Sequence, residues 1–291
     1  MGIIEFLKAV LFGIVEGVTE WLPISSTGHM ILLQHFMPLN VSEEFWKMFE
    51  VVVQLGAIIA VVILYWNKLW PFATKKYKEA MENKGKDVGQ IGMFKTGAVD
   101  MWLKIIIACV PAAVIGLAFD DKIDELFYHP IPVALALIIV GIVFIVVEST
   151  IGKNKKPTVT KISQITYKDA VLIGLFQLVA AIFPGTSRSG ATIVGGVIIG
   201  LSRGLAAEFT FFLAVPVMFG ASLLKMVKYI AEVGFAFSGA EAMILIVGTL
   251  VAFFVSVVVI KFLMSYIKKH DFKVFGWYRI VLGILVVLVL R

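Results

Sequence analysis

The chain has 291 residues, of which 60% are hydrophobic and only 16% are charged. A soluble domain usually has about 45–50% apolar and about 25% charged residues, so this composition excludes a single water-facing globule and indicates an integral membrane protein. The net charge of +6 does not indicate nucleic-acid binding, because the basic residues gather in a few loops between apolar segments. That pattern indicates which loops lie in the cytoplasm and which contact anionic lipid. The single cysteine, Cys109, excludes an intrachain disulfide and a cysteine-based zinc cluster.

A membrane-spanning helix needs roughly 20 mostly apolar residues, and six segments meet this requirement. They are residues 45–66, 103–119, 131–150, 209–230, 241–264 and 274–290. Two more apolar stretches, 3–37 and 168–201, are interrupted near their middle, at Pro23–Gly28 and Pro184–Gly190. Each is predicted to be a re-entrant hairpin of two half-length helices. Non-helical backbone at membrane depth is tolerated only beside protein or a wet cavity, so the two breaks predict a cavity.

Lysines and acidic residues in the connections predict the orientation, because basic loops remain in the cytoplasm. The basic residues of loops 67–102 and 152–168 are Lys68, Lys75, Lys76, Lys78, Lys84, Lys86, Lys95, Lys153, Lys155, Lys156, Lys161 and Lys168. Both loops are therefore expected in the cytoplasm. The connection 120–130, with Asp120, Asp121, Asp124 and Glu125, is expected to be a solvated outer loop, and the base-free connection 38–44 is also expected outside. Both termini then lie outside, the first hairpin opens outward and the second opens to the cytoplasm.

An internal repeat supports this inversion. A shift of 161 positions places Gly13, Glu16, Pro23 and Ser26 on Gly174, Gln177, Pro184 and Ser187. The predicted fold is thus one all-α integral-membrane domain, residues 1–291, with six transmembrane helices and two re-entrant hairpins in an inverted-topology repeat. Repeat 1 covers about 1–150 and repeat 2 about 165–291. Such repeats place polar sites near the midplane, where the broken helices meet.

The first break carries acidic and hydroxyl side chains. Glu16 and Glu20 are four residues apart, so both carboxylates share one helix face and can serve one cation or one proton-transfer path. Ionisable groups inside an apolar membrane segment are expensive and indicate function. The hydroxyls of Ser25, Ser26 and Thr27 and the imidazole of His29 follow, although Ser25 or Ser26 could instead cap the next half-helix. A neutral imidazole there can act as base, acid, nucleophile or ligand.

The second break, Pro184-Gly185-Thr186-Ser187-Arg188-Ser189-Gly190, predicts an anion site. Its small residues and the following half-helix N-terminus offer backbone N–H groups, and Arg188 adds a planar fork suited to phosphate oxygens. Arg188 is expected to be the only arginine at membrane depth, and it could instead merely neutralise Glu16 or Glu20. Other expectations are weaker: Glu50 and Gln54 share a face near the carboxylates, Arg203 and Glu208 form an interfacial pair, and Glu148 lies at the cytoplasmic end of its helix.

Acids, hydroxyls, a histidine and an arginine-bearing loop in a membrane cavity suit phosphoryl transfer on an amphiphile. A divalent ion would neutralise phosphate oxygens, Arg188 would stabilise the transition state, and a hydroxyl or imidazole would attack or direct water. No GxxxxGK[ST] motif occurs, so ATP is not expected as the phosphate source.

These residues resemble the undecaprenyl-diphosphate phosphatases, also called bacitracin-resistance proteins. The resemblance rests on Glu16-x-x-x-Glu20, on the run Trp21-Leu22-Pro23-Ile24-Ser25-Ser26-Thr27-Gly28-His29, and on Pro184 to Gly190. It extends over essentially the whole chain, including Ala206-Ala207-Glu208-Phe209, without departures at the motif positions.

The resemblance implies an enzyme of the bacterial inner membrane that removes the terminal phosphate of undecaprenyl diphosphate on the outer, periplasmic side. Its product is the lipid carrier of peptidoglycan synthesis, and the activity confers bacitracin resistance. Glu16 and Glu20 would bind Mg²⁺ or Ca²⁺, Arg188 would bind phosphate, and Ser26 or His29 would be the nucleophile, with Ser26 favoured. The further residues expected to contact substrate are Ser25, Thr27, Gln54, Gly185, Thr186, Ser187 and Ser189.

A second class of function is compatible with the same topology, because inverted repeats with paired re-entrant hairpins are also a transporter architecture. The protein could flip a lipid phosphate or carry a small anion. The chemistry is asymmetric, however, since Glu20 corresponds to Ala181 in the second repeat. This asymmetry favours an enzyme built on a transporter-like scaffold. The expected partners are the bilayer, a polyprenyl diphosphate lipid and no nucleic acid; a homodimer is possible for such folds.

Overall fold

The computed structural model of the protein describes residues 2–83, 93–152, 156–234 and 237–290. Lys84, Lys86, Lys153 and Lys155 of the predicted cytoplasmic loops lie outside these residues. Within the described ranges the regular elements are all helices, and the only β-structure there is two isolated β-bridges. The helices are α1 (Ile3–Thr19), α2 (Ser26–Phe36), α3 (Glu43–Val52), α4 (Gln54–Leu64), α5 (Trp66–Leu69), α6 (Lys75–Glu82), α7 (Thr96–Phe127), α8 (Pro130–Val147), α9 (Tyr167–Ile182), α10 (Arg188–Ile198), α11 (Arg203–Val233), α12 (Gly239–Tyr266) and α13 (Lys273–Val289).

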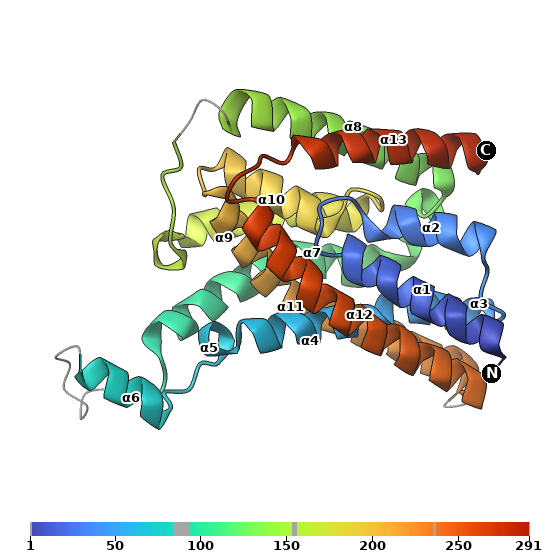
Figure 1. Cartoon of the computed structure of the whole chain (residues 1–291), viewed down its shortest axis with the longest axis horizontal. Helices are drawn as coiled ribbons and strands as arrows, with labels where there is room; N and C mark the ends of the chain where they lie inside the picture. The colour runs from blue at the N-terminus through green and yellow to red at the C-terminus, as the bar shows by residue number, and fades with distance from the viewer. Residues whose placement is uncertain (1, 84–92, 153–155, 235–236, 291) are drawn as a thin grey trace.

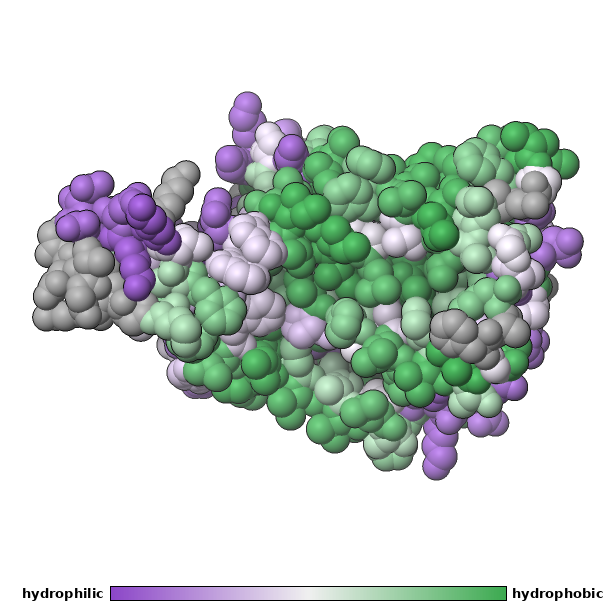
Figure 2. Space-filling model, turned by 90° about the horizontal axis from the view of Figure 1, so that it is seen from below, coloured by the Kyte–Doolittle hydropathy of each residue, from purple (hydrophilic) through white to green (hydrophobic). Residues whose placement is uncertain are grey.

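Five described segments are long and apolar enough to cross a membrane. They are Glu43–Leu64, Thr96–Phe127, Pro130–Gly152, Arg203–Val233 and Gly239–Tyr266. These match five of the six predicted spans, and the sixth corresponds to α13, which has 17 residues. Figure 2 shows hydrophobic residues over the middle of one face and hydrophilic residues gathered towards its two ends. The chain is therefore a multi-pass membrane protein.

The two interrupted stretches fold as helix pairs, α1 with α2 and α9 with α10. Ser25 and Ser187 cap the second helix of each pair, and their hydroxyls accept hydrogen bonds from the backbone N–H groups of Gly28 and Gly190. Both serines have a positive φ, 73° and 68°, which is strained for a residue with a side chain. Ser25 is therefore the structural counterpart of Ser187, at a spacing of 162 residues.

This spacing corrects the repeat alignment inside the break. The 161-residue shift pairs Ser26 with Ser187, whereas the capping geometry pairs Ser26 with Arg188, the first residue of each following helix. The one-residue difference arises between the proline and the capping serine, because one residue separates Pro23 from Ser25 and two separate Pro184 from Ser187.

The two helix pairs enter the molecule from opposite ends (Figure 1). Helices α1 and α2 reach the centre from the end where both termini lie, and α9 and α10 reach it from the end where α6 lies. Helix α1 packs on α12 and α9 packs on α7.

Glycine allows equivalent close helix approaches in the two halves. A Cβ on Gly13 of α1 would lie 2.5 Å from the carbonyl oxygen of Gly248, and one on Gly174 of α9 would lie 2.6 Å from that of Ala108. Small residues at such positions let membrane helices pack backbone to backbone. The breaks are thereby held between long helices near the centre of the molecule.

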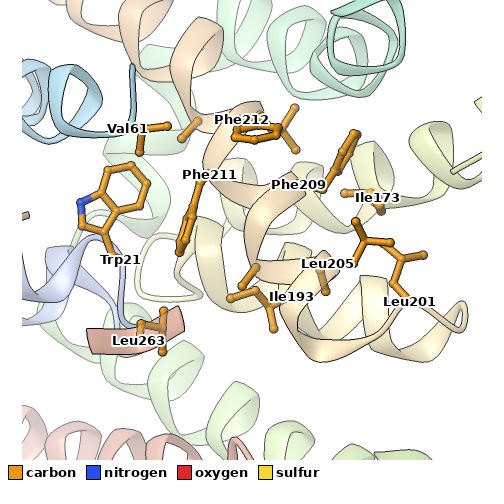
Figure 3. Close-up of a cluster of buried hydrophobic side chains, with 14 of the residues drawn as sticks. Trp21, Val61, Ile173, Ile193, Leu201, Leu205, Phe209, Phe211, Phe212 and Leu263 are labelled. Carbon is orange, nitrogen blue, oxygen red and sulfur yellow. The ribbon is translucent and has the colours of Figure 1, made fainter. Parts of the chain in front are cut away.

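An aromatic cluster fixes the first break against α11. Trp21 is fully buried, and its ring and that of Phe211 form a T-shaped pair with a centroid distance of 5.2 Å. Figure 3 shows Trp21 facing Phe211, with Val61 of α4 and Phe212 nearby. Such aromatic pairs bury a large apolar area in a defined geometry. The contact therefore fixes the backbone just before the break relative to α11.

The outer loop predicted at 120–130 is wrong for most of its length, because α7 continues to Phe127. Asp120 and Asp124 form ion pairs with Lys225 of α11, and Asp120 and Asp121 pair with Lys228. The neighbouring lysines neutralise the acids, so the helix extends beyond its apolar part.

The predicted Arg203–Glu208 pair is also wrong. Arg203 pairs with Glu148, and Glu208 pairs with Lys68. Residues five apart lie on different faces of a helix, whereas residues three or four apart share one. Each side chain therefore finds a partner on another segment.

Candidate active site

The two breaks meet through an ion pair between Glu20 and Arg188. Glu20 directly follows α1 and Arg188 begins α10, and the Arg188 Nη2 atom donates to Glu20 Oε1 at 2.7 Å. Both side chains are nearly buried, with 8% and 13% of their areas exposed. The hydroxyl of Ser189 adds a bond to the Glu20 carbonyl oxygen at 3.0 Å. Residues 168 positions apart thus form one polar cluster.

Ser26 completes this cluster from the first break. Its Oγ donates to Glu20 Oε2 at 3.1 Å, so both carboxylate oxygens of Glu20 are occupied. Arg188 also donates through Nη1 to the carbonyl oxygen of Thr210, at 3.1 Å, and its guanidinium lies 6.0 Å from the centroid of the Trp21 ring. These contacts hold the Arg188 fork in one orientation.

Glu16 has different surroundings from Glu20, although one helical turn separates them. Glu16 is fully buried, and neither of its carboxylate oxygens has a hydrogen-bond partner. It lies at the buried end of a cavity of about 670 Å³. A buried carboxylate without partners is costly, so this position is suited to a cation or a proton.

The cavity runs from Glu16 to charged residues at one end of the molecule. Its wall includes Ser26, Thr27, Glu50 and Gln54. The hydroxyl of Tyr128 donates to the Glu50 carboxylate. The charged residues at its mouth are Glu43, Glu44, Lys47, Asp121, Asp124, Glu125, Lys225, Lys228 and Glu232. They come from the start of α3 and the ends of α7 and α11, at the end where both termini lie (Figure 1).

His29 lies beside the cluster but is not among the residues that line the cavity. Its Nδ1 atom is 2.7 Å from the Ser25 carbonyl oxygen, and its Nε2 atom is 2.7 Å from the Tyr278 hydroxyl. The two rings stack with 8° between their planes. Both ring nitrogens are therefore already engaged.

The other predicted contact residues divide into two groups. Thr27 and Gln54 line the cavity together with Glu16 and Ser26. The remaining residues are not among those that line the cavity: Ser25, Gly185, Thr186 and Ser187 form the two turns, and Ser189 lies in the first turn of α10. The first group can contact a ligand in the cavity, and the second shapes the backbone behind it.

Arg279 of α13 is a site residue that the sequence prediction missed, and it corrects the expectation that Arg188 is the only arginine at membrane depth. It is fully buried and donates to the carbonyl oxygens of Pro23, Gly185 and Thr186. Its signal in the sequence is plain: it is the one charged residue within the apolar run 274–290.

The fold and this cluster define a class: a helical, multi-pass membrane protein with buried acids and an arginine where two broken helices meet. The sequence profile of the family described as "Bacitracin resistance protein BacA" matches residues 9–285. The chain belongs to this family.

Curated relatives match nearly the full chain. It is 59% identical to the "Undecaprenyl-diphosphatase" of Desulfitobacterium hafniense over 99% of this chain and 97% of the relative. It is 59% identical to "Undecaprenyl-diphosphatase 1" of Clostridium acetobutylicum, over 96% and 95%. It is 55% identical to an "Undecaprenyl-diphosphatase" of Enterococcus faecalis, over 98% and 97%.

Proposed function

We propose that the chain is an undecaprenyl-diphosphatase whose reaction takes place at the Glu20–Arg188–Ser26 cluster. It hydrolyses undecaprenyl diphosphate to undecaprenyl phosphate and inorganic phosphate, and it confers bacitracin resistance, as its family description states. The observation that carries the assignment of the site is the ion pair of Glu20 with Arg188, with Ser26 bonded to the same carboxylate. The cavity beside it has room for a diphosphate.

Ser26 is the proposed nucleophile. Its hydroxyl already donates to Glu20, so this carboxylate can accept the proton while Ser26 Oγ attacks the terminal phosphorus. The bond to the bridging oxygen breaks, undecaprenyl phosphate leaves, and water then hydrolyses the phosphoserine to release inorganic phosphate. His29 is the weaker candidate because both of its nitrogens already have partners.

Arg188 is proposed to bind the transferred phosphoryl group. A guanidinium has five N–H donors, and three of its contacts here are to Glu20, Thr210 and Met218. Free donors remain for phosphate oxygens. Their fixed orientation stabilises charge that develops in the transition state.

A divalent cation, Mg²⁺ or Ca²⁺, fits beside Glu16. Both Glu16 oxygens lack partners, and Glu50 and Gln54 line the same cavity. No cluster of three or more His, Cys, Asp or Glu side chains suited to a metal occurs in the described part of the chain. Mg²⁺ is usually held by one or two carboxylates plus substrate phosphates, and Glu16 and Glu50 would supply the carboxylates here. When bound, the ion would neutralise charge on the diphosphate.

In the membrane, we propose six spans, the five long segments and α13, with α1–α2 and α9–α10 as re-entrant hairpins of an inverted repeat. Entry of the two pairs from opposite ends supports this arrangement (Figure 1). The cavity would open to the outer side of the bacterial inner membrane. Support comes from its mouth, where six acidic side chains outnumber three lysines.

Phosphate release from a polyprenyl diphosphate by the detergent-purified protein tests the proposal. Wild-type protein should release phosphate, a chelator should abolish the release, and Glu20→Gln should lack it while remaining folded. Near-normal turnover by Glu20→Gln would overturn the site assignment.

Opposed helix pairs are also found in transporters, so the alternative is movement of a lipid phosphate or small anion. Monodisperse wild-type protein that releases no phosphate but moves a labelled lipid phosphate across liposomes would establish that alternative.

A further inference from the structure

Arg279 bonds to both helix breaks at once. Its Nη1 atom donates to the Pro23 carbonyl oxygen at 3.3 Å, and its Nη2 atom donates to those of Gly185 and Thr186, each at 2.8 Å. Pro23 belongs to the first break, and Gly185 and Thr186 belong to the second. One side chain on a third element, α13, therefore joins the two halves of the site.

The charge of Arg279 has no carboxylate partner. The side chain is fully buried, and no ion pair among the described residues includes it. Burial of an unpaired charge is costly unless polar groups replace water around it. Three backbone carbonyls serve that purpose for the two Nη atoms, whereas the buried Nε atom has no partner. These carbonyls can accept from Arg279 because the helices are broken at these positions.

These carbonyls lie next to the reacting groups. Thr186 is two residues before Arg188, and Pro23 is three residues before Ser26. Gly185 has φ +93°, a backbone conformation that few other residues adopt. The preceding residue of α13, Tyr278, bonds to His29. Consecutive residues of α13 thus touch both breaks.

The position of α13 is itself fixed by close packing on α8. A Cβ on Gly141 would lie 2.7 Å from the carbonyl oxygen of Gly276, and the reverse distance is also 2.7 Å. Gly276 is one helical turn before Arg279. The guanidinium is therefore presented from a rigid support rather than from a mobile segment.

We propose that Arg279 is a positioning residue for the reaction: it holds the two breaks together so that Ser26 and Arg188 meet at Glu20. The inference rests on the proposed phosphatase function. Arg279 is fully buried and donates to backbone carbonyls of the two turns, so it acts through the turns and not through substrate. Geometry of this kind controls rate strongly, since a misplacement of about 1 Å can cost about 10²-fold.

Arg279→Lys tests the proposal because it keeps the charge and removes the planar fork. An ammonium is a point charge and cannot reproduce the directions of the three bonds. We expect kcat to fall by about 10²-fold with KM nearly unchanged, since the cavity wall is intact. Arg203→Lys is the matched control: it makes the same change in a pair with Glu148 that lies outside the cavity, and it should retain wild-type kcat.

Hydrogen exchange at the breaks gives a readout independent of activity. In Arg279→Lys, backbone amides of residues 24–28 and 185–190 should exchange faster, whereas those of α12 should not change. Wild-type kcat, or unchanged exchange at both breaks, in folded Arg279→Lys would overturn the proposal. If neither Arg279→Lys nor Arg279→Gln folds, Arg279 serves folding alone and the proposal is also overturned. An inactive wild-type protein would instead refute the phosphatase function. The exchange data would still test whether Arg279 holds the two breaks together.

Discussion

At the scale of single residues, the proposed chemistry depends on two carboxylates with different partners. Arg188 and Ser26 occupy both oxygens of Glu20, which is therefore placed to take a proton from Ser26. Glu16 has no partner and is fully buried beside the cavity. A buried carboxylate without a partner is strongly destabilising. A bound cation would therefore stabilise Glu16 more than Glu20, whose oxygens already have partners.

Glu16→Gln should therefore weaken metal binding. The amide keeps the shape of the side chain but loses the charge, and we expect the metal concentration for half-maximal activity to rise by about tenfold or more. Calorimetric titration of Ca²⁺ or Mn²⁺ into the purified variant measures the same change without turnover. Glu208→Gln is the control, because Glu208 pairs with Lys68 away from the cavity. Unaltered metal affinity in Glu16→Gln would contradict the assignment.

Arg188→Lys should reduce the rate of phosphate release by about 10²-fold or more. Lysine cannot keep the bonds to Glu20 and Thr210 and also present a planar fork to phosphate. The rate is measured under saturating substrate, with Arg203→Lys as the control for the same substitution elsewhere. Equal rates in wild type and Arg188→Lys would show that only the charge of Arg188 matters.

At the scale of elements, the site depends on short helices that begin at its centre. Helices α2 and α10 have 11 residues each, and their N-termini, with Ser26 and Arg188 as first residues, point their free N–H groups and dipoles at the cluster. This favours an anion there. The long helices around them must then approach closely enough to hold the breaks in place.

Gly56→Ala tests that close approach. A Cβ at Gly56 of α4 would lie 2.0 Å from the carbonyl oxygen of Thr249 in α12, so the two helices must separate. We expect a loss of about 1–3 kcal/mol in the free energy of unfolding, measured as a lower Tm in detergent. Gly116→Ala of α7 is the control, because a Cβ there meets nothing within 4 Å; it should be neutral or slightly stabilising. Equal Tm values for the two variants would refute this packing argument.

At the scale of the whole molecule, the two helix pairs bring their breaks together from opposite ends (Figure 1). Glu20 and Arg188 come from different halves of the chain, and only this opposed entry lets them meet near the middle. The site is therefore assembled by the complete fold, and neither half contains it.

The orientation in the membrane is tested by cysteine labelling in a Cys109→Ser background. Met93 and Asn40 are exposed and lie in connections predicted on opposite sides. An impermeant reagent applied outside should label Asn40→Cys and not Met93→Cys, because the lysine-rich loop 67–102 is expected in the cytoplasm. Permeabilised cells, in which both should react, serve as the control. Labelling of Met93→Cys in intact cells would reverse the orientation.

Local sequence patterns predicted the spans well, because a run of apolar residues has few alternatives to a membrane helix. They failed where the outcome depends on a distant partner. The acids after Phe119 remain helical because Lys225 and Lys228 of α11 lie beside them. Arg203 pairs with Glu148, 55 positions away. Such contacts leave no local signal.

The sequence by itself determined the membrane class, the two helix breaks and the chemical groups of the candidate site, because hydrophobicity and ionisable residues in apolar runs are local properties. Only the tertiary structure decided how those groups are used. In the folded protein Glu20 accepts hydrogen bonds from Arg188 and Ser26, and Glu16 lies beside the cavity without a partner. Arg279 bonds to the carbonyls of both breaks. The physical reason is that each of these outcomes depends on distances between segments far apart in the chain, which the packing of the long helices sets.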